Sequence, residues 1–179
     1  MEYAQRQRGS KEQKVRQRLL QYIGLGRTAV LLVLFFSLIN QLLFWFRVDY
    51  HFLLSASAPY YLNWLSRMLD GMSGVFLLKL FAVLVTPLSF VAYGACWFFS
   101  AQRRHVIKTA LLFYGIDTLF LVVFALGCIK NPLNCLLEFL VHVIGLAVLY
   151  QAHHCAQQLH RMSKKKRPRP ASEQTESFG

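Results

Sequence analysis

Residues 75–99 read VFLLKLFAVLVTPLSFVAYGACWFF, an apolar run with a single charged side chain, Lys79. An α-helix rises about 1.5 Å per residue, so about 20 such residues cross the ~30 Å hydrocarbon core of a bilayer. Further apolar runs of approximately this length occupy residues 28–46, 109–128 and 133–150. Within hydrocarbon, helices and closed barrels alone satisfy their own backbone hydrogen bonds. The sequence therefore predicts an all-α fold, a four-helix transmembrane bundle.

The composition agrees with a membrane protein. Of the 179 residues, 55% are hydrophobic and 16% are charged, against about a quarter charged in soluble domains. The net charge of +12 is concentrated in the two tails and in one short loop beside the apolar runs. That placement is typical of juxtamembrane charge on an anionic leaflet and argues against nucleic-acid binding.

The basic residues also predict sidedness. Sixteen of the 20 Lys and Arg residues lie in the first 27 residues, between residues 103 and 108, or from residue 161 onward. The positive-inside rule then puts both termini in the cytoplasm of a multi-pass plasma-membrane protein. The basic residues expected to contact the anionic inner leaflet are Lys11, Lys14, Arg18, Arg103, Arg104, Lys164, Lys165 and Lys166.

Three segments make up the predicted organisation. Residues 1–27 form a basic cytoplasmic tail that is partly an amphipathic helix, residues 28–152 form the membrane domain, and residues 153–179 form a second basic tail with a disordered end. The long connection after the first span contains a further helical pattern, which predicts an external interfacial or re-entrant helix. Ser57 is expected to cap this helix, with Pro59 in its first turn.

Four ionisable residues lie inside the predicted spans, where each costs about 2.5–3.5 kcal/mol to insert. They are Asp117, His142, Glu138 and Lys79. One hypothesis is a polar relay, in which Asp117 and His142 pass a proton and Glu138 and Lys79 form its outer mouth. The alternative is structural, with paired polar groups that hold the helices together. A metal site made by Asp117, Glu138 and His142 matches no known ligand spacing, so no metal or other cofactor is predicted.

The geometry of the last two spans sharpens this hypothesis. A short turn joins them, so they are antiparallel neighbours, and Asp117 and His142 differ in depth by about one helical turn. We expect Asp117 to face the bundle interior with His142 as its nearest ionisable neighbour. Cys128 and Cys135 flank the turn and are a candidate disulfide pair. A polar patch of Ser37, Asn40 and Gln41 on the first span is expected to make interhelical hydrogen bonds.

Residues 50–62 read YHFLLSASAPYYL, with Asn40 upstream in the first span. This stretch resembles an element in an uncharacterised family of small bacterial multi-spanning membrane proteins, through Phe52, Ser55, Ala56 and Pro59 together with Tyr60. The resemblance covers residues 40–62 and implies a bacterial membrane protein with no assigned activity.

Enzyme signatures such as HExxH and GxSxG are absent from the sequence. The predicted function is therefore that of a non-enzymatic accessory or scaffold component, whose partners are the lipid bilayer and another membrane protein. The alternative is a small transporter or proton-translocating subunit that uses Asp117 and His142.

Overall fold

The computed structural model describes residues 2–48, 50–70, 75–100, 105–127 and 132–165, and within these ranges the chain is entirely helical apart from its connections. The helices, in chain order, are α1 (Glu2–Trp45), α2 (Ser57–Met68), α3 (Val75–Phe99), α4 (His105–Gly127) and α5 (Pro132–Lys165).

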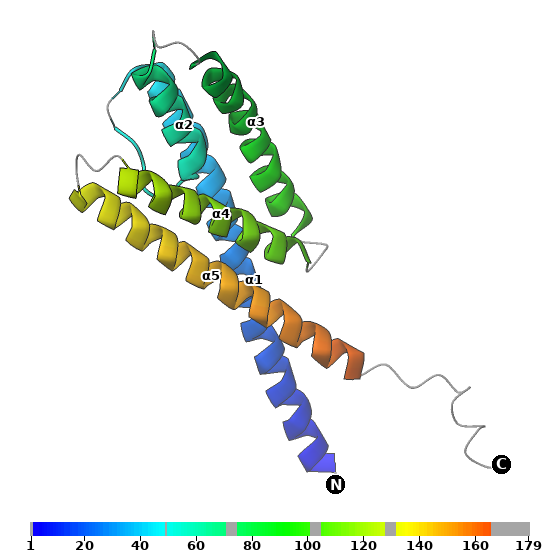
Figure 1. Cartoon of the computed structure of the whole chain (residues 1–179). Coiled ribbons are helices and arrows are strands. Elements are labelled where there is room, and N and C mark those ends of the chain that lie inside the picture. The colour runs from blue at the N-terminus through cyan, green and yellow to red at the C-terminus, as the bar shows by residue number, and fades with distance from the viewer. Residues whose placement is uncertain (1, 49, 71–74, 101–104, 128–131, 166–179) are drawn as a thin grey trace, which may run out of the picture.

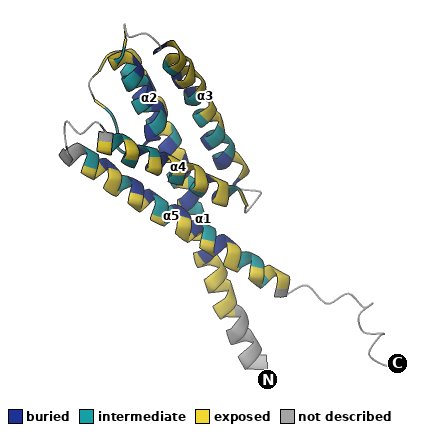
Figure 2. Ribbon diagram, in the orientation of Figure 1, coloured by how far each residue is buried: buried dark blue, intermediate teal, exposed yellow. Residues whose placement is uncertain are grey.

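The four long helices α1, α3, α4 and α5 are each long and apolar enough to cross a membrane. Their outward faces carry large apolar side chains, such as Phe76, Leu88 and Leu126, which are 74%, 67% and 77% exposed. Figure 2 shows that exposed residues run along all four of these helices. A soluble domain buries such side chains away from water, whereas in a bilayer they can face the hydrocarbon of the lipid.

Helix α2 is too short to span a bilayer and lies among the longer helices at one end of the molecule (Figure 1). It packs against α1, α3 and α4. At the opposite end, the first part of α1 and the last part of α5 extend beyond the other helices. The expected additional short helix is therefore present, but it is packed into the bundle on three sides.

Two helices are longer than the apolar runs suggest. Helix α1 begins at Glu2 and continues without a break past residue 27, and α5 continues past residue 150 to Lys165. The polar segment of α5, residues 151–165, is rich in Ala, Gln, Lys and His and contains no Gly or Pro. Nothing in that composition interrupts a helix that has already formed.

Helices α1 and α5 approach closely at two small residues, Gly26 and Ala152. A Cβ placed on Gly26 would lie 2.4 Å from the Ala152 Cβ, well inside the contact distance of two carbon atoms. Ala152 is fully buried there, and Ile107 and Ala156 complete this part of the core. Small residues at a crossing let two helix backbones approach, which is the usual packing of membrane helices.

Candidate functional site

The chain between α1 and α2 folds back against the end of α1 because polar side chains of α1 bind its backbone. The Asn40 amide accepts a hydrogen bond from the Phe52 N–H at 2.7 Å and donates to the Phe52 carbonyl at 2.9 Å. It also donates to Ser55 Oγ at 2.7 Å. The Ser37 hydroxyl accepts from the Ala56 N–H at 2.7 Å. The predicted polar patch therefore faces inward, but most of these bonds join it to the connection.

Replacing Asn40 with Leu should lower the free energy of unfolding by about 2–3 kcal/mol. It leaves the Phe52 N–H without its acceptor and removes the donors from Asn40 to Ser55 Oγ and to the Phe52 carbonyl, which then keeps only the Ser55 hydroxyl as a donor among the described residues. The measurement is an SDS titration of the purified protein in micelles, followed by circular dichroism. Gln41→Met is the matched control, because Gln41 makes a single long contact, from Asn63 at 3.3 Å, and such bonds average about 0.6 kcal/mol in membrane proteins. Equal losses in the two variants would contradict this role of Asn40.

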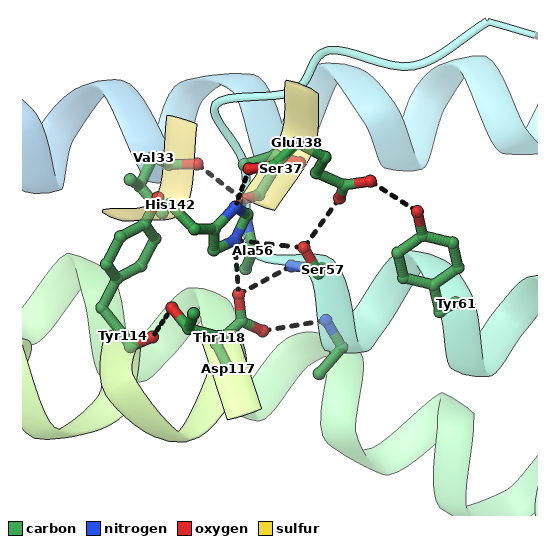
Figure 3. A network of polar contacts seen from close by, with 12 residues as sticks. Val33, Ser37, Ala56, Ser57, Tyr61, Tyr114, Asp117, Thr118, Glu138 and His142 are labelled. Atoms are coloured by element: carbon green, nitrogen blue, oxygen red, sulfur yellow. Dashed lines mark hydrogen bonds and ion pairs between the residues drawn. The ribbon is translucent and has the colours of Figure 1, made fainter. Parts of the chain in front are cut away.

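Helix α2 is capped by a side chain from another helix. Its N-cap residue, Ala56, provides no side-chain hydrogen bond. Instead the Asp117 carboxylate of α4 accepts from the Ser57 N–H through Oδ2 and from the Ala58 N–H through Oδ1, both at 2.8 Å (Figure 3). Pro59 has no N–H. The carboxylate thus satisfies the first free donors of α2 and lies at the positive end of its dipole.

The prediction that Ser57 caps α2 is therefore wrong. Ser57 is the first residue within the helix, and its hydroxyl points to α5, where it donates to Glu138 Oε1 at 2.8 Å. A cap hydroxyl must lie one residue earlier to reach the free N–H groups of the first turn. Because Ala56 occupies that position and has no hydroxyl, the Asp117 carboxylate of α4 accepts these hydrogen bonds instead.

Glu138 joins α5 to α2 and to the connection. Its Oε2 accepts from the Tyr61 hydroxyl at 2.5 Å, and His51 Nε2 lies 3.6 Å from the same oxygen, an ion-pair distance. Burial, followed by the negative charge of Glu138, raises the pKa of the Tyr61 phenol well above its ordinary value. Tyr61 therefore keeps its proton and acts as a donor to the carboxylate.

His142 completes the cluster from the next turn of α5. Its Nδ1 lies 3.0 Å from the Glu138 carbonyl, and its Nε2 lies 3.1 Å from Ser57 Oγ and 3.3 Å from Asp117 Oδ2. The ring stacks on Tyr114, with centroids 4.9 Å apart. A Cβ on Gly145 would come within 2.7 Å of that tyrosine ring, so a glycine there makes room for the stack. The Tyr114 hydroxyl is buried and has no partner among the described residues.

Three of the four ionisable residues singled out in the spans meet in this cluster: Asp117, His142 and Glu138 are 6%, 0% and 2% exposed. The expectation that Asp117 faces the interior beside His142 agrees with these positions. Lys79 does not join them. Its ammonium pairs with Asp70 at 2.6 Å, and both side chains are exposed. Lys79 lies in the first turns of α3, and Asp70 lies just beyond the end of α2, which packs against α3.

Sequence reasoning missed the part that Ser57, Tyr61 and His51 play in the cluster. Each lies in the connection or in α2, where a polar residue carries no energetic signal of the kind that an ionisable residue in a span carries. The one feature of the sequence that could have pointed to Ser57 is the stretch of small residues around it, just before a proline. It reads as a turn, and the structure uses it to bring backbone N–H groups close to α4.

The arrangement differs from a nucleophile–base–acid triad. In such a triad the serine and the carboxylate lie on opposite ring nitrogens of the histidine. Here Ser57 and Asp117 both approach Nε2, while Nδ1 faces a backbone carbonyl. Ser57 is also completely buried. Among the described residues, no group of three His, Cys, Asp or Glu side chains could hold a metal ion.

The remaining sequence-based assignments are distributed over the ends of the molecule. Lys11, Lys14, Arg18 and Lys164 are exposed, and Lys165 is the last residue of α5. Arg103, Arg104, Lys166 and Cys128 lie outside the described residues. The lipid contacts of all eight basic residues and a bridge between Cys128 and Cys135 stay predictions.

The chain matches no protein-family model, no curated protein and no solved structure. The resemblance at residues 40–62 therefore has no family model behind it, and the function has to be argued from the geometry.

Proposed function

We propose that this chain is a non-enzymatic integral membrane component, of the accessory or scaffold kind. The observation that carries the proposal is that every oxygen of the two buried carboxylates is hydrogen-bonded within the protein. Both oxygens of Asp117 accept backbone N–H groups of α2, and both oxygens of Glu138 accept hydroxyl groups. Carboxylates paired in this way stabilise the packing of α2, and this accounts for their burial without a substrate.

The long ends of α1 and α5 support a scaffold function further. They extend beyond the other helices (Figure 1). The described residues of these ends include the exposed basic side chains of Lys11, Lys14, Arg18 and Lys164. A basic, exposed helical surface suits contact with anionic lipid and with an acidic partner protein.

The test is affinity purification of the tagged full-length chain from native membranes in mild detergent. We expect a membrane protein to be retained at constant stoichiometry and to be lost from the variant Lys11→Gln/Lys14→Gln/Arg18→Gln. A chain that purifies alone, and that moves protons when reconstituted into liposomes, would refute the scaffold function in favour of transport.

We also propose a plasma-membrane topology with both termini in the cytoplasm and α2 at the outer face, supported by the distribution of Lys and Arg. In a cysteine-free background, a cysteine at Asp70 should react with an impermeant maleimide in intact cells, because that side chain is exposed. A cysteine at Lys164, also exposed, should react only after the membrane is opened. The reverse pattern would invert the topology.

A second candidate function, proton translocation, is favoured by one observation. His142 Nε2, Ser57 Oγ and Glu138 Oε1 form an unbroken chain with steps of 3.1 and 2.8 Å. The Glu138 carbonyl only accepts, so a proton belongs on Nδ1, and Nε2 then needs a second proton to donate toward Ser57 and Asp117. That second proton can pass through the Ser57 hydroxyl to Glu138, whose other oxygen lies 3.6 Å from the half-buried His51.

The variant Ser57→Ala breaks this chain without removing an ionisable group. If this hydrogen-bonded chain conducts protons, the interior of liposomes that hold the unaltered protein should acidify under an imposed potential. Ser57→Ala should slow the acidification at least tenfold, whereas the control Ser66→Ala should leave it unchanged. Ser66 bonds only to the Asn63 carbonyl of its own helix. An unaltered protein that leaves the internal pH unchanged excludes this second function.

A further inference from the structure

A groove of about 330 Å³ lies between the beginning of α4 and the last turns of α5. Its charged walls come from Lys108 on α4 and Arg161 on α5, and three histidines, His105, His153 and His160, line it as well. The described residues around it include no Asp or Glu. The groove is therefore a concave surface of one sign of charge, separate from the polar cluster in the middle of the bundle.

No acidic side chain among the described residues that line the groove offsets the charges of Lys108 and Arg161. Neither Lys108 nor Arg161 takes part in an ion pair within the described ranges. The structure nevertheless holds the two cations on facing helices, whose buried contact through Ile107, Ala152 and Ala156 lies close by. Holding like charges together costs free energy, and an anion in the groove removes that cost.

His153 adds a hydrogen-bond donor. Its Nε2 lies 2.9 Å from the Gln157 amide nitrogen, which only donates, so Nε2 accepts and the ring proton lies on Nδ1. That Nδ1 is buried and has no partner among the described residues, so it is an unsatisfied donor in the wall of the groove. Guanidinium, ammonium and imidazole donors on one concave surface match an anion with several acceptor oxygens, as phosphate has.

The position of the groove selects among phosphate compounds. It lies where α4 begins, next to the predicted cytoplasmic surface, and an anionic lipid presents its head group at that level. We infer that this groove binds a phosphate-bearing anionic head group. The inference does not depend on the scaffold function, because it concerns other residues at another level of the bundle.

The test uses the purified full-length protein in micelles, to which dioleoyl phosphatidic acid and dioleoyl phosphatidylcholine are added in equal amounts, with native mass spectrometry to count retained lipids. We expect phosphatidic acid to be retained in preference. The variant Lys108→Gln/Arg161→Gln should bind it roughly 30-fold more weakly, since each basic residue at a membrane surface contributes about fivefold. Lys164→Gln removes an exposed charge from the same helix outside the groove and should change binding by less than the groove variant.

A second pair of variants keeps every charge. Gln157→Phe places a ring in the groove, whereas Gln158→Phe places it at the neighbouring exposed position that does not line the groove. Only the first should reduce retention of phosphatidic acid, and this pair decides the question if the charge variant fails to fold. Equal retention by Gln157→Phe and Gln158→Phe, or equal loss in the groove variant and Lys164→Gln, would overturn the inference.

One further measurement distinguishes a lipid head group from free phosphate as the ligand. Inorganic phosphate is titrated against the protein loaded with phosphatidic acid. Persistence of the lipid at millimolar phosphate would support a head-group site, whereas displacement of the lipid would overturn the head-group assignment and show a site for the free anion.

Discussion

Replacing Asp117 with Ala is expected to lower the free energy of unfolding by about 3–5 kcal/mol, the usual cost of removing one partner from a buried charged contact. The substitution leaves the Ser57 and Ala58 N–H groups without acceptors and removes the carboxylate beside His142. Asp117→Asn should cost less, because the amide keeps one acceptor oxygen. SDS titration in micelles measures both changes.

Thr118→Ala is the matched control for this experiment. Thr118 is the next residue of α4 and is also buried, at 7% exposed, but its hydroxyl bonds only to the Tyr114 carbonyl one turn earlier. Such a bond within one helix contributes little, so we expect a loss below about 1 kcal/mol. If Asp117→Ala were no more destabilising than Thr118→Ala, the carboxylate would not be the cap of α2.

The second large effect is expected at the crossing of α1 and α5. Gly26→Ala puts a methyl group 2.4 Å from the Ala152 Cβ, and neither atom is the end of a flexible side chain that can move aside. The helices must separate, which we expect to cost about 1–3 kcal/mol, as for other overpacked contacts.

Gly24 provides the control, since a Cβ there meets nothing within 4 Å. Gly24→Ala should therefore stabilise the helix by about 0.5–1 kcal/mol, because Ala loses less conformational entropy than Gly. The double variant Gly26→Ala/Ala152→Gly moves the methyl group to the other helix and should recover most of the loss. A stabilising effect of Gly26→Ala would show that the two helices do not cross at this point.

Some residues of the polar cluster can be recognised from the sequence, and others cannot. Asp117, Glu138 and His142 are conspicuous because an ionisable side chain in a long apolar run needs a reason to be there. The partners of these residues are not conspicuous. Two of the groups that Asp117 binds are backbone N–H groups, which every residue except proline has, so no pattern of side chains points to them.

Lys79 is conspicuous in the sequence but does not belong to the cluster. The sequence marks it as strongly as the other three, since it also lies within an apolar run. It lies near the beginning of α3, however, where its side chain is 45% exposed and reaches Asp70 just beyond α2. Depth along a helix can be counted from the sequence, but the rotation of α3 about its axis is set by the packing of its neighbours.

By itself the sequence determined the helical class, the number of long apolar helices and the residues whose burial needs a partner. These are properties of single segments, because length and hydrophobicity act on each helix independently of the others. Only the tertiary structure decided that α2 begins against Asp117, that Ser57 reaches Glu138 and His142, and that Gly26 meets Ala152. Each of those contacts joins positions far apart in the chain, and its formation depends on the crossing and rotation of whole helices, which the packing of all their side chains fixes together.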